Sequence, residues 1–129
     1  MKYSFEIFSP KITINLIDEI VFNKLRVSLI NFYEQQDNNY NMLVNIHPFN
    51  NNTFMTDTGK RIKYTSQLAL SGNAGNQIIY QNNNNSDWDF ESQKQQRIMA
   101  LDLEIYINGS LFHSQINNNS GLLIEITFL

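Results

Sequence analysis

The sequence predicts an all-β protein, an antiparallel β-sandwich of about seven to nine strands, and three observations lead to this prediction. Apolar and polar residues alternate along most of the chain, which is the period of a strand with one buried face. Turn-forming segments return about every 8–15 residues, as they do in sandwiches and barrels. Asn108-Gly109 lies between two alternating segments and is a strong hairpin signal.

The length and composition favour one compact domain. The chain has 129 residues, of which 42% are hydrophobic and 12% aromatic, enough to form a core. No linker divides the sequence, so we expect residues 1–129 to form a single sandwich domain. The segments richest in turn-forming residues are 35–39, 48–60, 71–76, 81–89 and 117–121.

The first expected strand covers residues 3–7, where Tyr3, Phe5 and Ile7 share one face and Ser4 and Glu6 the other. Pro10 then separates this strand from the next one. The same alternation predicts the strands at residues 12–16, 40–46 and 62–70, and a short apolar run predicts a strand at 77–80.

Residues 15–33 allow two interpretations. Apolar residues at 17, 20, 21, 25, 29 and 32 fit a helical stripe, which Asn15 would cap. Five β-branched residues in the segment favour strands instead, as does the position of Phe22 and Ile30 off that stripe. The strand interpretation gives two short strands, one with Ile20 and Phe22 and one running from Leu25 to Leu29.

The last third predicts a three-stranded antiparallel meander. Residues 101–107 alternate, Asn108-Gly109 forms a two-residue turn, and residues 110–116 return alongside. This register sets Ile107 opposite Ser110, and Glu104 opposite His113 on the outer face. After a turn at 117–121, residues 122–128 alternate as the third strand.

Composition excludes several classes of site and partner. The chain has no Cys, and therefore no disulfide, thiolate nucleophile or zinc–cysteine site. A net charge of −3 gives no footprint for nucleic acid. The densest basic cluster, Lys60, Arg61 and Lys63, is typical of a solvated strand edge. No apolar run approaches the length of about 20 residues that a membrane-spanning helix needs.

Few residues suit catalysis, so we predict a protein without enzymatic activity, catalytic residues, metal site or cofactor. His47 precedes Pro48 at a strand end, and neither His47 nor His113 has a second histidine at metal-ligand spacing. The acidic segment 85–91 alternates oxygen-bearing residues but lacks the glycine of a calcium loop. Trp88, within that segment, is a possible ligand contact, for example by stacking on a sugar.

Two alternating N-terminal segments, the sequence Asp18-Glu19-Ile20-Val21-Phe22, and a last strand after the Ser120-Gly121 turn occur in this order. This order resembles chaperone–usher pilin subunits of the cysteine-free, colonisation-factor type, and more loosely the spore-coat-protein-U family. The resemblance covers most of the chain and rests on pattern. Asn23 stands where the family customarily has a glycine.

The resemblance implies an immunoglobulin-like sandwich with Greek-key or meander connections that lacks one strand. A neighbour's N-terminal strand would fill the gap by β-strand addition. Residues 1–9 would be the exchanged donor strand, with Tyr3, Phe5 and Ile7 as the inserted side chains. The alternative is that residues 3–7 pair within their own domain. The implied partners are further copies of the chain, as a homopolymer, and a periplasmic chaperone and usher.

The resemblance thus favours a structural subunit that self-assembles into a filament or surface appendage. The alternatives are a lectin- or adhesin-like binding module that uses Trp88, and an intracellular component of a secretion, phage or viral assembly. A secretory signal is not visible in residues 1–15. The expected location is therefore extracellular or on the cell surface for a mature chain, and cytoplasmic if Met1 is native.

Overall fold

The computed structural model describes residues 1–33, 38–72, 77–78, 88–111 and 121–129. Strands are the only regular secondary structure among them, which confirms the all-β prediction. The strands are β1 (Lys2–Ile7), β2 (Lys11–Tyr33), β3 (Asn38–His47), β4 (Asn52–Met55), β5 (Arg61–Tyr64), β6 (Ser66–Gly72), β7 (Gln77–Ile78), β8 (Phe90–Ile107), β9 (Ser110–Leu111) and β10 (Gly121–Phe128).

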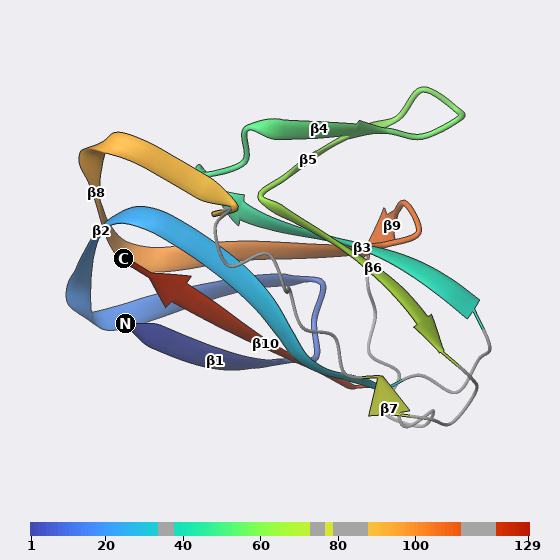
Figure 1. Cartoon of the computed structure of the whole chain (residues 1–129), viewed down its shortest axis with the longest axis horizontal. Coiled ribbons are helices and arrows are strands. Elements are labelled where there is room, and N and C mark those ends of the chain that lie inside the picture. Colours follow the sequence, from blue (N-terminus) through green and yellow to red (C-terminus); the bar gives the residue numbers. More distant parts are fainter. Residues whose placement is uncertain (34–37, 73–76, 79–87, 112–120) are drawn as a thin grey trace.

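The strands form one large antiparallel sheet and a separate hairpin. The sheet has the order β1-β10-β2-β8-β3-β6, with β7 beside β2 and β9 beside β8. Strands β4 and β5 pair only with each other. The two chain ends lie side by side (Figure 1), where the Met1 ammonium group donates a hydrogen bond to the Phe128 carbonyl oxygen over 2.9 Å.

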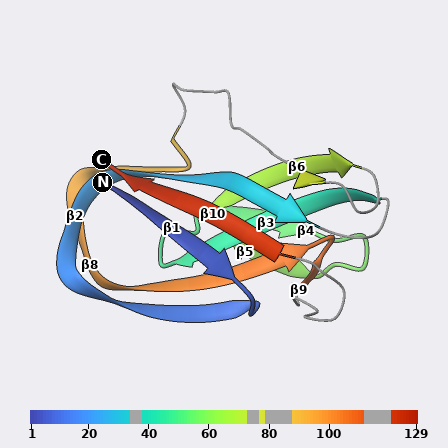
Figure 2. The ribbon, with the colours of Figure 1, turned by 90° about the horizontal axis from the view of Figure 1, so that it is seen from below.

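The two longest strands, β2 and β8, bend together and fold the sheet over itself (Figure 2). They pair on both sides of a bulge, Lys11–Asn15 with Ala100–Glu104 and Ile20–Leu25 with Phe90–Ile98. Between these stretches, residues 16–19 of β2 stand opposite Met99 alone. Extra residues on one strand bend it and increase its twist. One layer therefore contains β1, β10 and the second half of β2, and the other contains the first half of β2, the second half of β8, β3 and β6.

The core lies between these layers and is filled by alternate residues of each strand. Phe22 is 2% exposed, and its ring meets Phe49, Phe90 and Phe128 at centroid distances of 5.1, 6.3 and 5.0 Å. Such tilted and edge-on ring pairs add to the free energy of burial. Ile17, on the bulge, is 97% exposed because the bend turns it outward.

A smaller apolar contact lies on the outer face of β3. Leu43 and Ile62 are 1% and 3% exposed, yet neither belongs to the main core cluster. The β4–β5 hairpin covers Leu43 from outside, with β5 against β3. Strand β4 falls inside the segment 48–60 that the sequence suggested as turn, so that expectation was too broad.

Two sequence ambiguities are settled by the pairing pattern. Residues 15–33 are strand and not helix, and they belong to one bent strand where two short strands were expected. The expected strand at 62–70 is divided at Thr65, whose buried hydroxyl group contacts the backbone after β3. It donates a hydrogen bond to the Phe49 carbonyl oxygen over 2.7 Å and accepts one from the Ile46 N–H group over 2.9 Å.

The Asn108-Gly109 turn is confirmed, with φ angles of 51° and 83° and Ile107 opposite Ser110. The rest of the expected register, including the contact of Glu104 with His113, falls on residues 112–120, outside the described ones. The meander itself was wrong, because β10 pairs with β1 and β2. Strand β8 has β2 on one edge and β3 on the other, and among the described residues only Tyr106 and Ile107 of β8 pair with β9.

We expect the replacement Phe22→Ala to lower the free energy of unfolding by about 3–5 kcal/mol, since it leaves a cavity where three other rings meet. Ile17→Ala removes an apolar side chain that is 97% exposed and should change that free energy by less than about 0.5 kcal/mol. Urea denaturation followed by circular dichroism measures both. Equal losses in the two variants would contradict the assigned core.

Candidate functional site

The N-terminal strand β1 is the principal candidate site, because it lies at the end of the sheet order and, among the described strands, pairs only with β10. Six residue pairs join the two strands, from Lys2 opposite Thr127 to Ile7 opposite Leu122. Main-chain hydrogen bonds extend the ladder to Met1, whose carbonyl oxygen accepts from the Phe128 N–H group over 2.8 Å. Residues 3–7 therefore pair within their own domain in this structure.

The three predicted site residues of β1 lie together on its inner side. Ile7 is fully buried, while Tyr3 and Phe5 are half-buried and pack against the core. The Tyr3 ring stacks on Phe5 at 6.3 Å and meets Phe128 edge-on at 6.1 Å. The alternation read from the sequence thus gives the correct inward face, and these side chains anchor β1 to the core.

The outer side of β1 carries polar residues and a short connection to β2. Lys2, Ser4 and Glu6 are exposed, and the Lys2 ammonium group lies 3.6 Å from the Glu125 carboxylate on β10. The connection is only residues 8–10, in which the Phe8 side chain is 58% exposed. By residue 10 the chain has reached the other layer, where the Pro10 carbonyl oxygen accepts a hydrogen bond from Ile105 N–H over 2.9 Å.

Trp88, the other predicted contact, is half-buried and lies against two cations of β2. The Arg26 guanidinium carbon lies 4.8 Å from the ring centroid and the Lys24 ammonium nitrogen 5.8 Å from it. Cation–π attraction of this kind is strongest for tryptophan. The Nε and Nη2 atoms of Arg26 are buried without a hydrogen-bond partner. No local pattern predicts this contact, since 62 positions separate Arg26 and Trp88.

The neighbouring Asp89 supports the edge of β2. Its carboxylate accepts a hydrogen bond from the Val27 N–H group over 2.7 Å. Burial raises the pKa of the Asp89 carboxyl group above its ordinary value of 3.8, although the Val27 hydrogen bond, the Arg26 charge and Ser66 act in the opposite direction. Glu91 forms an ion pair with Lys24 at 3.7 Å. Among the residues that the structure describes, no three His, Asp or Glu side chains are placed to hold a metal ion.

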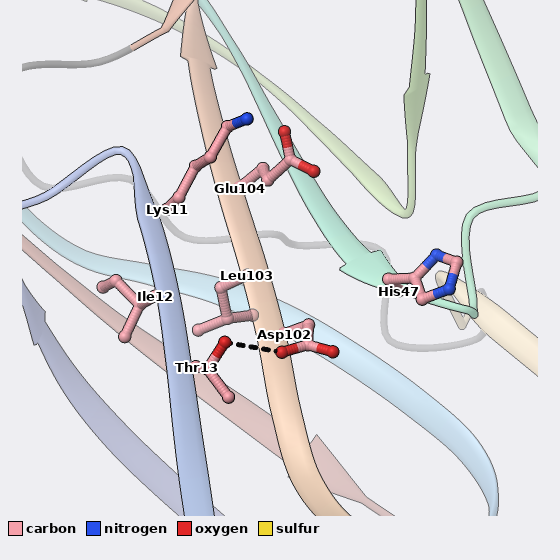
Figure 3. A pocket seen from close by; sticks show the side chains of 7 residues that line it. All are labelled: Lys11, Ile12, Thr13, His47, Asp102, Leu103 and Glu104. Atoms are coloured by element: carbon pink, nitrogen blue, oxygen red, sulfur yellow. Dashed lines mark hydrogen bonds between the residues drawn. The ribbon is translucent and has the colours of Figure 1, made fainter.

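A hollow lies across the outer face of β2, β8 and β3 and has a volume of about 330 Å³ (Figure 3). It is lined by Lys11, Ile12, Thr13, His47, Asp102, Leu103 and Glu104. The Thr13 hydroxyl group donates a hydrogen bond to Asp102 over 2.8 Å, and exposed His47 ends β3 on the far side of Asp102. The sequence could not reveal this hollow, since only the pairing of three strands assembles it.

The basic cluster is divided between two roles. Arg61 and Lys63 are exposed on β5, as a solvated strand edge would have them. Lys60 instead reaches the Asn108-Gly109 turn, where its ammonium group lies 3.3 Å from the Gly109 carbonyl oxygen and 5.8 Å from the centroid of the Tyr106 ring.

The comparisons with known proteins add no relative. The chain matches no family model, and neither the curated proteins nor the solved structures compared with it give a match. The described segments contain no helix that is long and apolar enough to cross a membrane.

We expect the stability difference between the wild type and Asp89→Asn to depend on pH. A raised pKa means that the folded chain binds the proton more tightly than the unfolded chain does. The carboxyl group therefore favours folding below its ordinary pKa of 3.8 and loses this contribution as the pH rises through the raised value. Asparagine keeps an oxygen acceptor for Val27 but does not titrate.

The free energy of unfolding of the wild type should accordingly fall relative to that of Asp89→Asn as the pH rises above 3.8. Urea titrations at several pH values measure the difference. If the difference in free energy of unfolding stayed constant with rising pH, or grew in favour of the wild type, the assigned burial of the Asp89 carboxyl group would be contradicted.

Proposed function

We propose that the protein is a non-enzymatic structural subunit that self-assembles into a filament or surface appendage by β-strand exchange. The observation that carries this proposal is the position of β1. It is a terminal strand that pairs with β10 alone, yet it contributes Tyr3, Phe5 and Ile7 to the core. A second copy of β1 can make the same contacts with the β10 of a neighbour.

The energetics favour a tight link once exchange has occurred. Burial of three such side chains stabilises the link by several kcal/mol, at about 1.5–3 kcal/mol for each fully buried one. The contacts are the same in the closed and exchanged forms, so the connection between β1 and β2 decides between them. This connection is short and ends in Pro10, which restricts Ser9 to extended conformations. Short, strained hinges favour exchange of the element that they join.

The geometry of exchange determines the kind of assembly. Each chain would donate β1 at one place and accept a neighbour's β1 at another, which is a head-to-tail contact. Contacts of this kind that do not close produce filaments. The immunoglobulin-like arrangement of a pilin, the chaperone and usher partners and a location on the cell surface belong to the same proposal.

The exchange is tested by cysteine pairing, because the natural chain has no cysteine. Lys2 and Thr127 are directly opposite, at a distance that suits a disulfide. We expect a mixture of Lys2→Cys and Thr127→Cys chains, assembled together and then oxidised, to form a disulfide between chains. Mass spectrometry of isotopically distinct chains identifies the link. A disulfide that forms only within the double variant Lys2→Cys/Thr127→Cys, and never in the mixture, would contradict exchange.

Microscopy gives an independent measure of the same proposal. Mass photometry and negative-stain images of the wild type should show filaments, and a chain without residues 1–9 should show none. The truncated chain keeps an open β10 and should bind a synthetic peptide of residues 1–9. A wild-type chain that stays monomeric at every concentration would reject the filament.

A second candidate function, a lectin- or adhesin-like binding module, is favoured by Trp88. Its half-buried ring lies against the Arg26 guanidinium group and the Lys24 ammonium group. This combination suits a sugar that carries an acidic group, since arginine pairs well with carboxylates. Trp88 is the only tryptophan, so its fluorescence reports binding directly. Titration with acidic and neutral saccharides should change the fluorescence for the acidic ones alone, and no change with either would reject this candidate.

A further inference from the structure

The outer edge of β1 presents main-chain groups that have no partner strand among the described residues. Met1 and Phe128 exchange both of their main-chain hydrogen bonds, so they form a hydrogen-bonded pair. In an antiparallel ladder such pairs alternate, and the residues between them point their N–H and C=O groups the other way. Lys2, Ser4 and Glu6 therefore direct these groups outward. No strand of the described part of the sheet lies on that side.

The side chains of these three residues also leave a charge uncompensated. They are all exposed, with Lys2 at one end, Glu6 at the other and Ser4 between them. The Lys2 ammonium group has a loose ion pair with Glu125 at 3.6 Å. The Glu6 carboxylate has no ion pair among the described residues. An open edge with an unpaired carboxylate is suited to a partner that brings a cation to that position.

The sequence of the edge is complementary to itself. When two β1 strands run antiparallel about a two-fold axis at Ser4, Lys2 of each copy stands opposite Glu6 of the other. This register also brings all the outward main-chain groups face to face, because the same three residues carry them. On the inner face it places the half-buried Tyr3 of one copy opposite Phe5 of the other. Cross-strand pairs of opposite charge and of aromatic rings both stabilise a sheet.

We propose that two copies of the chain dimerise through their β1 edges, antiparallel and centred on Ser4, so that their sheets become one. The pairing requires only that β1 lies beside β10, whether β1 comes from the same chain or from a neighbour. It is therefore independent of strand exchange, and in an exchanged filament it would join two filaments laterally.

Two further edges of the large sheet that the structure describes fit a second copy less well. Strand β6, at the opposite end of the sheet order, contains no charged residue. The first half of β2 pairs with β8 on one side only within the described residues. By the same alternation, Lys11, Thr13 and Asn15 direct their main-chain groups outward there. Antiparallel pairing about Thr13 would place Lys11 opposite Asn15, with no negative charge to meet it. Of these three edges in the described part of the sheet, that of β1 combines free main-chain groups with matched charges.

Cysteine variants test the register directly, since the natural chain has no cysteine. Opposed residues in a hydrogen-bonded pair have Cα atoms about 5.5 Å apart, within the range of a disulfide. Ser4→Cys alone should therefore form a disulfide-linked dimer under mild oxidation. Lys2→Cys alone and Glu6→Cys alone should not, because identical positions lie about 13 Å apart in this register. A mixture of these two variants should form the mixed disulfide.

Random collisions are measured with Lys63→Cys, an exposed position on β5 away from the edge. Ser4→Cys should cross-link at least about tenfold faster than this control. Equal cross-linking rates for Ser4→Cys and Lys63→Cys would overturn the proposed register. It would also be overturned if Lys2→Cys cross-linked equally well alone and in the mixture with Glu6→Cys.

The charges are tested without a covalent bond by sedimentation equilibrium. Lys2→Glu places a glutamate opposite each Glu6 and should raise the dimer dissociation constant at least about tenfold. The double variant Lys2→Glu/Glu6→Lys exchanges the two charges and should restore the constant to within about threefold of the wild type. Lys63→Glu makes the same change in net charge on β5 and should leave it unchanged. If the double variant dimerised as weakly as Lys2→Glu alone, the proposed role of the Lys2–Glu6 charge pairs would be overturned.

The backbone contribution is tested with Ser4→Pro, which removes an outward N–H group without breaking the ladder to β10. This variant should keep its circular dichroism spectrum but, when combined with Lys2→Cys in one chain and Glu6→Cys in another, should form no mixed disulfide. A folded Ser4→Pro mixture that still cross-links at these two positions would overturn the proposal. Exchange and edge pairing are told apart by their cross-links. Ser4→Cys reports the edge, while the Lys2→Cys and Thr127→Cys mixture reports exchange, and either can fail alone.

Discussion

The fold depends on the common bend of β2 and β8. A straight strand of 23 residues would be about 75 Å long. A compact domain of this size has a radius of gyration of only about 14 Å. The chain meets this constraint by placing residues 16–19 opposite Met99 alone, so that both strands turn over together. Each strand then serves two layers, and a single sheet encloses its own core between its halves. The bend leaves Ile17 exposed, because no partner strand follows the bulge outward.

The bend also decides which strands become edges. Within the described residues, β8 is flanked by β2 and β3 and meets β9 only at Tyr106 and Ile107, while β10 lies beside the second half of β2. Strand β1 is then the last element of its layer and has a neighbour on one side only. Open edges of this kind are a liability that proteins must cover, blunt or use. Both proposals for β1 follow from this position, which no local property of residues 2–7 determines.

The sequence predicted which face of each strand is buried more accurately than which strands lie next to one another. Alternation located the inward faces of β1, β3 and β10 because it records which side of a strand is buried, a local property. It failed to separate helix from strand at 15–33 for a physical reason. The irregularities at Asn23 and Ile30 shift the inward phase of β2, so the buried residues are Ile20, Phe22, Leu25, Val27, Leu29 and Phe32. Within this set, residues 25, 29 and 32 have the spacing of a helix. The contact of Trp88 with Arg26 and the hollow near His47 depend on pairing between distant strands.

The charges on β1 explain how an open edge can accept its own copy without general aggregation. Charged edge residues normally prevent strands from pairing, since they oppose like charges or leave them unmatched. A parallel pairing of two β1 strands would set Lys2 against Lys2 and Glu6 against Glu6. An antiparallel pairing shifted by two residues would leave these charges opposite neutral residues. The antiparallel register centred on Ser4 matches both charges, so this arrangement of residues permits one partner geometry and disfavours the others.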